Sequence, residues 1–116
     1  MFTSKRDINT SKEIGADETK ELYSILVPAA AKCKILKFGN YLGDESAWGS
    51  VIWIILKNGI PVHPYDVVLD QLGIESLPRE VEIDEFDGGD LITFEAKNNY
   101  IDTVKVGLAL VYEFRD

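Results

Sequence analysis

Residues 104–114 read VKVGLALVYEF, and this stretch decides the fold of the chain. Apolar side chains occupy every second position, at Val104, Val106, Leu108, Leu110, Tyr112 and Phe114. Successive side chains of a β-strand point to opposite faces of its sheet, so this period of two predicts a long strand with one face against a core. The rest of the chain is expected to supply the strands that pack with it.

Shorter apolar runs, separated by turns rich in Gly, Pro, Asn and Asp, fill most of the remaining sequence. The predicted strands cover residues 22–27, 32–38, 50–56, 60–63, 80–86, 91–96 and 104–114. No long amphipathic helix competes with them, and this pattern is typical of an antiparallel β domain. Residues 64–78 are the least strand-like part, where one or two helical turns are predicted at residues 67–72, ending at Gly73.

The residue types at three places predict two tight turns and one β-bulge or bend. Asn58-Gly59 is predicted to close a tight hairpin, because both residue types tolerate a positive φ. The sequence DGGD at residues 87–90 is predicted to join its two flanking strands in the same way. In residues 32–38 the apolar period slips by one position, which predicts a β-bulge or bend.

Residues 51–56, VIWIIL, are apolar at every position. This strand is expected to be either central and covered on its second face, or half-buried at a contact with another subunit. Trp53 is expected in the core. The segment that follows holds Pro61, Pro64 and the only histidine, His63, and is expected at an edge or corner of a sheet, since proline cannot donate a ladder hydrogen bond.

Seven or so short strands in 116 residues predict a single all-β domain, an antiparallel β-sandwich of two sheets. A jelly-roll-like order is favoured, and an immunoglobulin-like order stays open, although the single cysteine excludes the usual disulfide of that fold. Residues 1–20 mix both signs of charge with Ser, Thr and Asn and show no period. They are predicted to form an N-terminal arm, flexible or ordered by a neighbour, ahead of the sandwich at residues 21–116.

Composition argues against several classes of protein. The formal net charge of −8 disfavours a role in gripping nucleic acid or anionic membranes, because that affinity comes from clustered Lys and Arg. The longest apolar run is too short to span a bilayer, and the polar N-terminus lacks the apolar stretch of a signal peptide. We therefore expect a protein made in the cytoplasm and soluble, with no membrane and no direct nucleic-acid partner.

No catalytic set, cofactor site or metal site is predicted. Cys33 lies in a predicted strand, where it is expected to be a buried small hydrophobe and not a nucleophile for His63. One His and one Cys cannot supply the ligands of a cupin-type or zinc site. The acidic residues of segment 80–90 are expected mainly as a solvated strand face. A hard cation bound by Asp84, Asp87 and Asp90 around the Gly-Gly turn stays open as an alternative.

Three aromatic residues are candidate binding residues. Trp48 lies at a junction between a loop and a strand with Tyr41 nearby, and Tyr65 follows Pro64. If these rings are exposed, they can stack on a sugar ring or fill a pocket of a partner. If they are packed, Tyr41 and Trp48 close one end of the sandwich.

The order of these features carries a resemblance. It consists of KILKFG at 34–39, an acidic loop before Trp48-Gly49, the apolar strand, NGIPV at 58–62, Gly89-Asp90 and GLALVYE at 107–113. Over about residues 22–114 this pattern resembles small β-sandwich proteins of tailed bacteriophage particles, namely capsid decoration or auxiliary head proteins and related fibre or adaptor modules. The likeness lies in strands and turns and in no catalytic motif.

The resemblance implies a non-enzymatic component of the virion, located on the capsid exterior and commonly a homo-oligomer. Its partner would be the major capsid protein, another virion protein or a further copy of the same chain. The alternative function is a carbohydrate-binding or receptor-binding module for host adhesion, which would use Tyr41, Trp48 and Tyr65.

Overall fold

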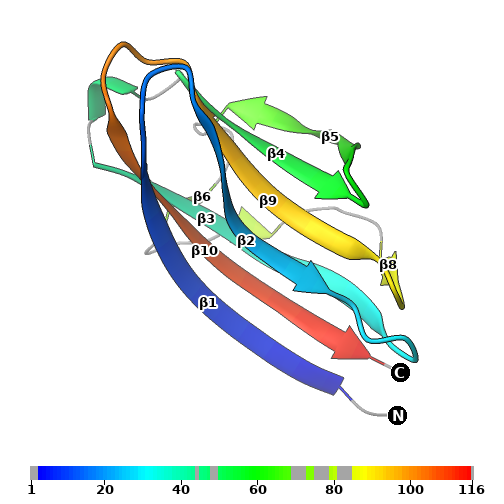
Figure 1. Ribbon diagram of the computed structural model, residues 1–116. Helices are drawn as coiled ribbons and strands as arrows, with labels where there is room; N and C mark the ends of the chain where they lie inside the picture. The colour runs from blue at the N-terminus through cyan, green and yellow to red at the C-terminus, as the bar shows by residue number, and fades with distance from the viewer. Residues whose placement is uncertain are drawn as a thin grey trace.

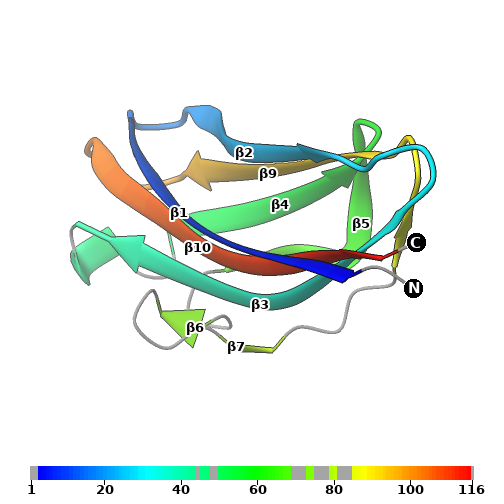
Figure 2. The ribbon, with the colours of Figure 1, turned by 90° about the horizontal axis from the view of Figure 1, so that it is seen from below.

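The computed structural model describes residues 3–43, 45–47, 50–68, 73–74, 79–80 and 85–115, with side chains described at 4–43, 46–47, 50–62 and 85–115. These residues form two sheets that pack face to face (Figures 1 and 2). The elements are β1 (Thr3–Ile14), β2 (Thr19–Leu26), β3 (Lys32–Leu42), the short 3-10 turn η1 (Glu45–Ala47), β4 (Val51–Lys57), β5 (Ile60–Val68), β6 (Gly73–Ile74), β7 (Arg79–Glu80), β8 (Phe86–Asp87), β9 (Leu91–Asn98) and β10 (Val104–Arg115). Among the described residues, no helix is long and apolar enough to cross a membrane.

The order of the strands is that of a jelly roll. Sheet A runs β1-β10-β3-β6, with β7 and β8 also paired to β3, and sheet B runs β2-β9-β4-β5. The pairing is nested, because β1 pairs with β10, β2 with β9, β3 with β7 and β8, and β4 with β5. Apart from the short parallel pairing of β6 with β3, the strands are antiparallel. The predicted jelly-roll-like sandwich is confirmed.

The core lies between the sheets, as the period of two in residues 104–114 predicts. The alternate residues of β10 from Val104 to Tyr112 are buried, and Ile92, Phe94 and Ala96 of β9 face them from sheet B. The Phe38 ring of β3 meets the Trp53 ring of β4 edge to face, with centroids 5.2 Å apart. Trp53 is 1% exposed, which confirms its place in the core.

The N-terminal segment differs from its prediction. The first strand pairs with β10 along its whole length, from Thr3 opposite Arg115 to Ile14 opposite Val104. The expectation of an arm that is flexible or ordered by a neighbour is therefore wrong for residues 3–14, because β10 of the same chain orders them. The residues of β1 that face the core side are mostly polar, since an edge strand near the open side of a sandwich buries little there.

The turn at residues 87–90 also differs from its prediction. It was expected to close a hairpin, but β8 pairs with β3 of sheet A while β9 belongs to sheet B. The turn therefore carries the chain from one sheet to the other. Of the predicted strand 80–86, the structure contains Glu80 in β7 and Phe86 in β8, and residues 81–84 lie outside the described residues.

The segment after the β4–β5 hairpin is an edge strand. β5 continues through Pro64 to Val68, so the helical turn predicted from residue 67 is wrong at residues 67 and 68, and residues 69–72 lie outside the described part. Asp66 pairs with Ile54 and Val68 with Ile52, which extends the ladder beyond the predicted end of the strand. β5 is the last strand of sheet B, as its prolines predict.

Two local predictions are confirmed. Asn58 and Gly59 form the β4–β5 turn with φ values of 52° and 84°. The bulge in β3 lies at Leu36, because Ile35 pairs with Tyr112 while Lys37 pairs with Val111.

Candidate functional site

The structure places the three candidate aromatic residues as follows. Tyr41 lies on the outer face of sheet A, is 44% exposed, and pairs across the strands with Gly107. A Cβ atom built on Gly107 would lie 3.2 Å from the Tyr41 Cβ, so the glycine lets the base of the tyrosine lie close against β10. Tyr65 belongs to β5 of sheet B, its side chain is outside the described part, and Trp48 lies outside the described residues. Tyr41 and Tyr65 therefore come from different sheets.

Cys33 is buried in the core and behaves as the sequence predicts. Its side chain is fully shielded from solvent on β3. Burial raises the pKa of the Cys33 thiol to about 12, and the nearby Glu113 carboxylate contributes to the increase. The thiol therefore stays protonated at neutral pH, which makes it a poor nucleophile. His63 lies in β5 of the other sheet, with its side chain outside the described part.

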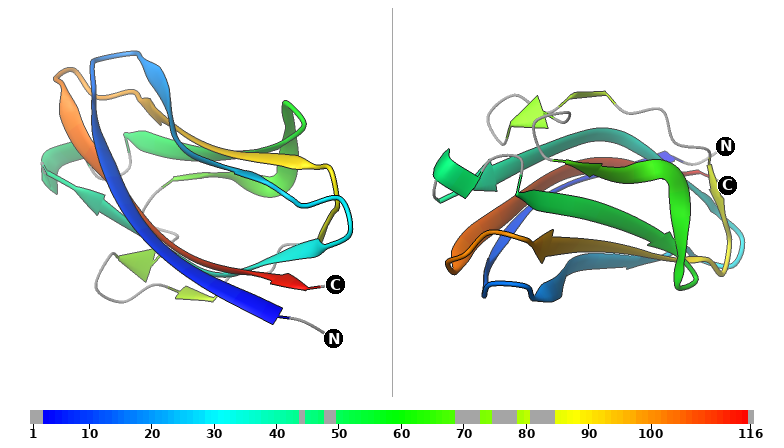
Figure 3. Two further views of the ribbon diagram at one scale, coloured as in Figure 1. Left: turned by 60° about the horizontal axis from the view of Figure 1, so that its bottom comes forward. Right: turned by 90° about the horizontal axis from the view of Figure 1, so that it is seen from above.

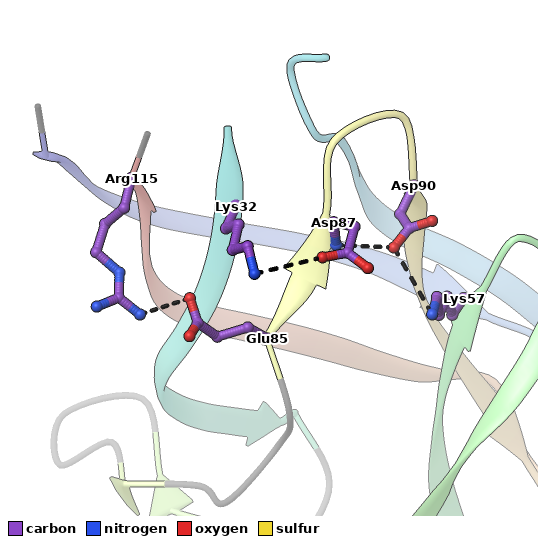
Figure 4. Close-up of polar contacts among 6 residues, drawn as sticks. All are labelled: Lys32, Lys57, Glu85, Asp87, Asp90 and Arg115. Atoms are coloured by element: carbon purple, nitrogen blue, oxygen red, sulfur yellow. Dashed lines mark hydrogen bonds and ion pairs between the residues drawn. The ribbon is translucent and has the colours of Figure 1, made fainter. Parts of the chain in front are cut away.

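The acidic turn is held by hydrogen bonds and cations of the chain (Figure 4). The Asp90 carboxylate accepts a hydrogen bond from Asn58 Nδ2 at 3.0 Å and one from the backbone N–H of Asp87 at 2.9 Å, and Lys57 Nζ lies 3.8 Å away. These contacts, with the Asn58 hydrogen bond first, lower the pKa of Asp90. Asp87 forms a further ion pair with Lys32 at 3.8 Å.

A second group of ions connects the end of β10 to the segment before β8. Arg115 pairs with Glu85 (Figure 4). Its Nε also lies 3.6 Å from Glu113 Oε1. In the described ranges, no three His, Cys, Asp or Glu side chains come together as a metal site would require. The ion pairs of Asp87 with Lys32 and of Glu85 with Arg115 connect the turn to β3 and β10. Asp84, the third candidate ligand, lies outside the described residues.

The outer face of sheet B carries an apolar surface. In β4 the buried residues alternate with half-buried ones, namely Ile52, Ile54 and Leu56, which point away from the core. β4 lies between β9 and β5, so the strand is central, and its second face is only partly covered. Pairing with β9 places Lys97, Glu95 and Thr93 beside these three residues.

The surface continues along the same face to the end of the sheet. Leu91 of β9 is 42% exposed and pairs with Leu26 of β2, which is 68% exposed. Together, five aliphatic side chains form what we term the sheet B strip, namely Leu26, Ile52, Ile54, Leu56 and Leu91. Exposed and half-buried apolar side chains gathered on one face of a sheet are a mark of an interaction site on a soluble protein.

The sequence predicts only part of this strip. Residues 51–56 predict it because they are apolar on both faces of the strand, whereas for Leu26 and Leu91 only strand positions are predicted. The sequence holds a signal at Leu26, because Ile25, Leu26 and Val27 are apolar in a row and a strand must turn one of them away from the other two. The structure buries Ile25 and Val27 and exposes Leu26. Its position beside Leu91 depends on the pairing of β2 with β9, which only the fold provides.

Comparisons with protein-family models, with curated proteins and with solved structures found no match to this chain.

Proposed function

We propose that this chain is a non-enzymatic structural protein of a bacteriophage particle, a capsid decoration or auxiliary head protein that attaches through the sheet B strip. Its partner is the major capsid protein or another virion protein, and copies of the chain associate with one another. The observation that carries the proposal is the strip itself, five aliphatic side chains on the solvent-facing side of a four-stranded sheet.

The physical chemistry of the strip favours a protein partner. Full burial of a Leu or Ile side chain contributes about 1.5–3 kcal/mol, so a partner that covers the strip gains a substantial apolar contribution. Thr93, Glu95 and Lys97 of the neighbouring strand β9 add polar and charged groups to the same face, which can form hydrogen bonds and ion pairs with a protein partner. The net charge of −8 favours a position away from packaged DNA.

The first test replaces the two exposed leucines with lysines, as Leu26→Lys/Leu91→Lys. We expect self-association, measured by light scattering after size exclusion, and co-sedimentation with capsids to weaken roughly tenfold or more, because the charges would be buried at the contact. The matched control is Ile101→Lys, since Ile101 is 81% exposed but lies in the β9–β10 loop. This control should associate like the wild type.

A wild-type protein that is strictly monomeric and also fails to bind capsids would contradict the proposal. The genes that flank this one give an independent test, since portal, major capsid or tail genes are expected beside it.

A second candidate function is carbohydrate or receptor binding, and the exposure of Tyr41 favours it. An aromatic ring on an exposed sheet face can stack against a sugar. Binding to a glycan array that Tyr41→Ala abolishes would support this function, while an array with no bound glycan would count against it.

A further inference from the structure

The end of the sandwich where the two chain termini lie side by side contains a pocket of about 310 Å³. The connection between β2 and β3 runs near both termini (Figure 3). Its residues form one wall of the pocket. The lining includes Ser4 and Arg6 of β1, Phe114 and Arg115 of β10, and Pro28 and Ala31 of the connection. This volume lies near the lower limit of small-molecule sites in proteins.

The aromatic ring in the pocket lining, Phe114, packs against a buried ring. Phe114 contacts Tyr112 edge to face, with ring centroids 5.5 Å apart. The Tyr112 hydroxyl shares a hydrogen bond of 2.9 Å with the Tyr23 hydroxyl of sheet B. Since Tyr112 is buried and fixed to both sheets, Phe114 rests on a rigid support, and a ligand would not have to order it.

The pocket has one cation that is not already neutralised. The Arg6 guanidinium carbon lies 5.5 Å from the centre of the Phe114 ring. Pairing of β1 with β10 places Ser4 opposite Phe114 and Arg6 opposite Tyr112, so both β1 side chains belong to the core-facing side. Within the described part of the chain, no carboxylate pairs with Arg6, whereas Arg115 is held by Glu85 and Glu113.

The wall formed by the β2–β3 connection is small and apolar. Pro28, Ala30 and Ala31 contribute no hydrogen-bonding side chain, and the Ala31 N–H donates to the Pro28 carbonyl oxygen at 3.0 Å, which fixes the turn. A ligand for this pocket therefore needs an apolar group against the wall and the Phe114 ring. It also needs an acceptor for the guanidinium.

We propose that this pocket binds a single carboxylate carried on a short apolar group. The planar guanidinium of Arg6 matches the two oxygens of a carboxylate, and the Ser4 hydroxyl can donate a further hydrogen bond. The apolar group lies on Phe114. A polyanion such as a nucleotide is disfavoured by the net charge of −8, while one negative charge is offset by Arg6. The ligand is either a free small acid or the C-terminal residue of a polypeptide. This site goes beyond the proposed function and does not depend on the sheet B strip.

The test uses phenylacetate as the free acid and N-acetylphenylalanine as the mimic of a polypeptide C-terminus, each with its neutral amide as a control. Titration of the full chain, followed by amide resonances in NMR, should show saturable shifts at residues 4–6, 29–31 and 113–115 with both acids. The amides should bind roughly tenfold more weakly, because they lose the charge-assisted pair.

Three variants connect the binding to Arg6. Arg6→Gln should weaken both acids roughly tenfold, and Arg6→Lys should give an intermediate affinity, since it keeps the charge and loses the planar fork. Lys5→Gln is the matched control, because Lys5 lies opposite Glu113 in the ladder of β1 and β10 and its side chain is on the other face of β1. It should bind like the wild type. Melting temperatures of all three variants show whether each is folded.

The outcomes separate the two sources of the carboxylate. Clearly tighter binding of N-acetylphenylalanine than of phenylacetate assigns the site to a polypeptide C-terminus, and equal or weaker binding assigns it to a free acid. The proposal is overturned if neither acid shifts these resonances, if the amides bind as tightly as the acids, or if the folded Arg6 variants keep wild-type affinity.

Discussion

Asn98 shows how one buried polar residue can fix several parts of a sandwich. Its Nδ2 donates to the Ile14 carbonyl oxygen at 2.9 Å and to the Asp102 carbonyl oxygen at 2.8 Å, and its Oδ1 accepts from the Tyr100 N–H at 2.8 Å. The side chain is fully buried at the end of β9. Asn98 therefore provides hydrogen-bond partners for backbone groups at the end of β1 and in the β9–β10 loop at the same time.

We expect Asn98→Ala to lower the free energy of unfolding by about 2–4 kcal/mol, because three backbone groups lose their partner in a buried site. Urea unfolding followed by tryptophan fluorescence measures the loss. Asn99→Ala is the control, since the Asn99 side chain is exposed and its backbone N–H still donates to the Ser50 carbonyl oxygen. Equal stability of the two variants would contradict this role of Asn98.

At the scale of the elements, the sequence predicted strands well where one face is buried. The strands of the core show a period of two, and β4 and β5 were recognised by apolar residues and prolines. β1 was missed because its inward positions hold Ser4, Arg6, Thr10 and Lys12, with Ile8 and Ile14 as its apolar exceptions. The sequence predicts a turn at 87–90, but the same residues can join two paired strands or two different sheets. The passage of the chain from sheet A to sheet B could therefore not be predicted from them.

The sheet B strip could be predicted only in part for a similar reason. Leu26 lies beside Leu91 because β2 pairs with β9, and the sequence does not show which strands pair.

The crossing turn yields a prediction that separates two roles of glycine. A Cβ atom on Gly88 would lie 2.3 Å from the Ala29 carbonyl oxygen, whereas one on Gly89 would meet nothing within 4 Å but would sit at a φ of 90°. We expect Gly88→Ala to cost about 2 kcal/mol or more, since backbone must move, and Gly89→Ala about 1–2 kcal/mol from φ alone. Chemical denaturation of both variants checks the order, and a more stable Gly88→Ala would contradict the close approach.

On one side of the molecule, sheet A ends in β1 and sheet B ends in β2, and a lysine of each strand bonds to the backbone of the other. Lys12 Nζ donates to the Glu21 carbonyl oxygen of β2 at 2.7 Å, and Lys20 Nζ donates to the Glu13 carbonyl oxygen of β1 at 3.1 Å. Lysines on edge strands discourage the pairing of another chain at that edge. Association between copies is therefore expected through a sheet face, which agrees with the proposed use of the sheet B strip.

The stability of the whole molecule is expected to fall in alkali. The pKa of Cys33 is raised from 9.0 to about 12, and burial also raises the pKa of Tyr112. A raised pKa means that the folded state holds its proton more tightly, so stability is complete below the unfolded pKa and is lost as pH rises above it. At about pH 10.5, the free energy of unfolding should be lower by roughly 2 kcal/mol than at neutral pH because of Cys33 alone. Urea midpoints across this range should drop less steeply in Cys33→Ala, and an unchanged slope would contradict the assignment.

The nested pairing of strands has a consequence for synthesis of the chain. β1 is synthesised before the other strands of the sandwich, whereas its partner β10 is synthesised after them, and β2 likewise pairs with the late strand β9. Contacts between residues so far apart in sequence slow folding, and sheet A cannot be completed before β10 has been made. The sandwich is therefore expected to fold late in synthesis, and the polar composition of β1 leaves little apolar surface exposed to aggregation until then.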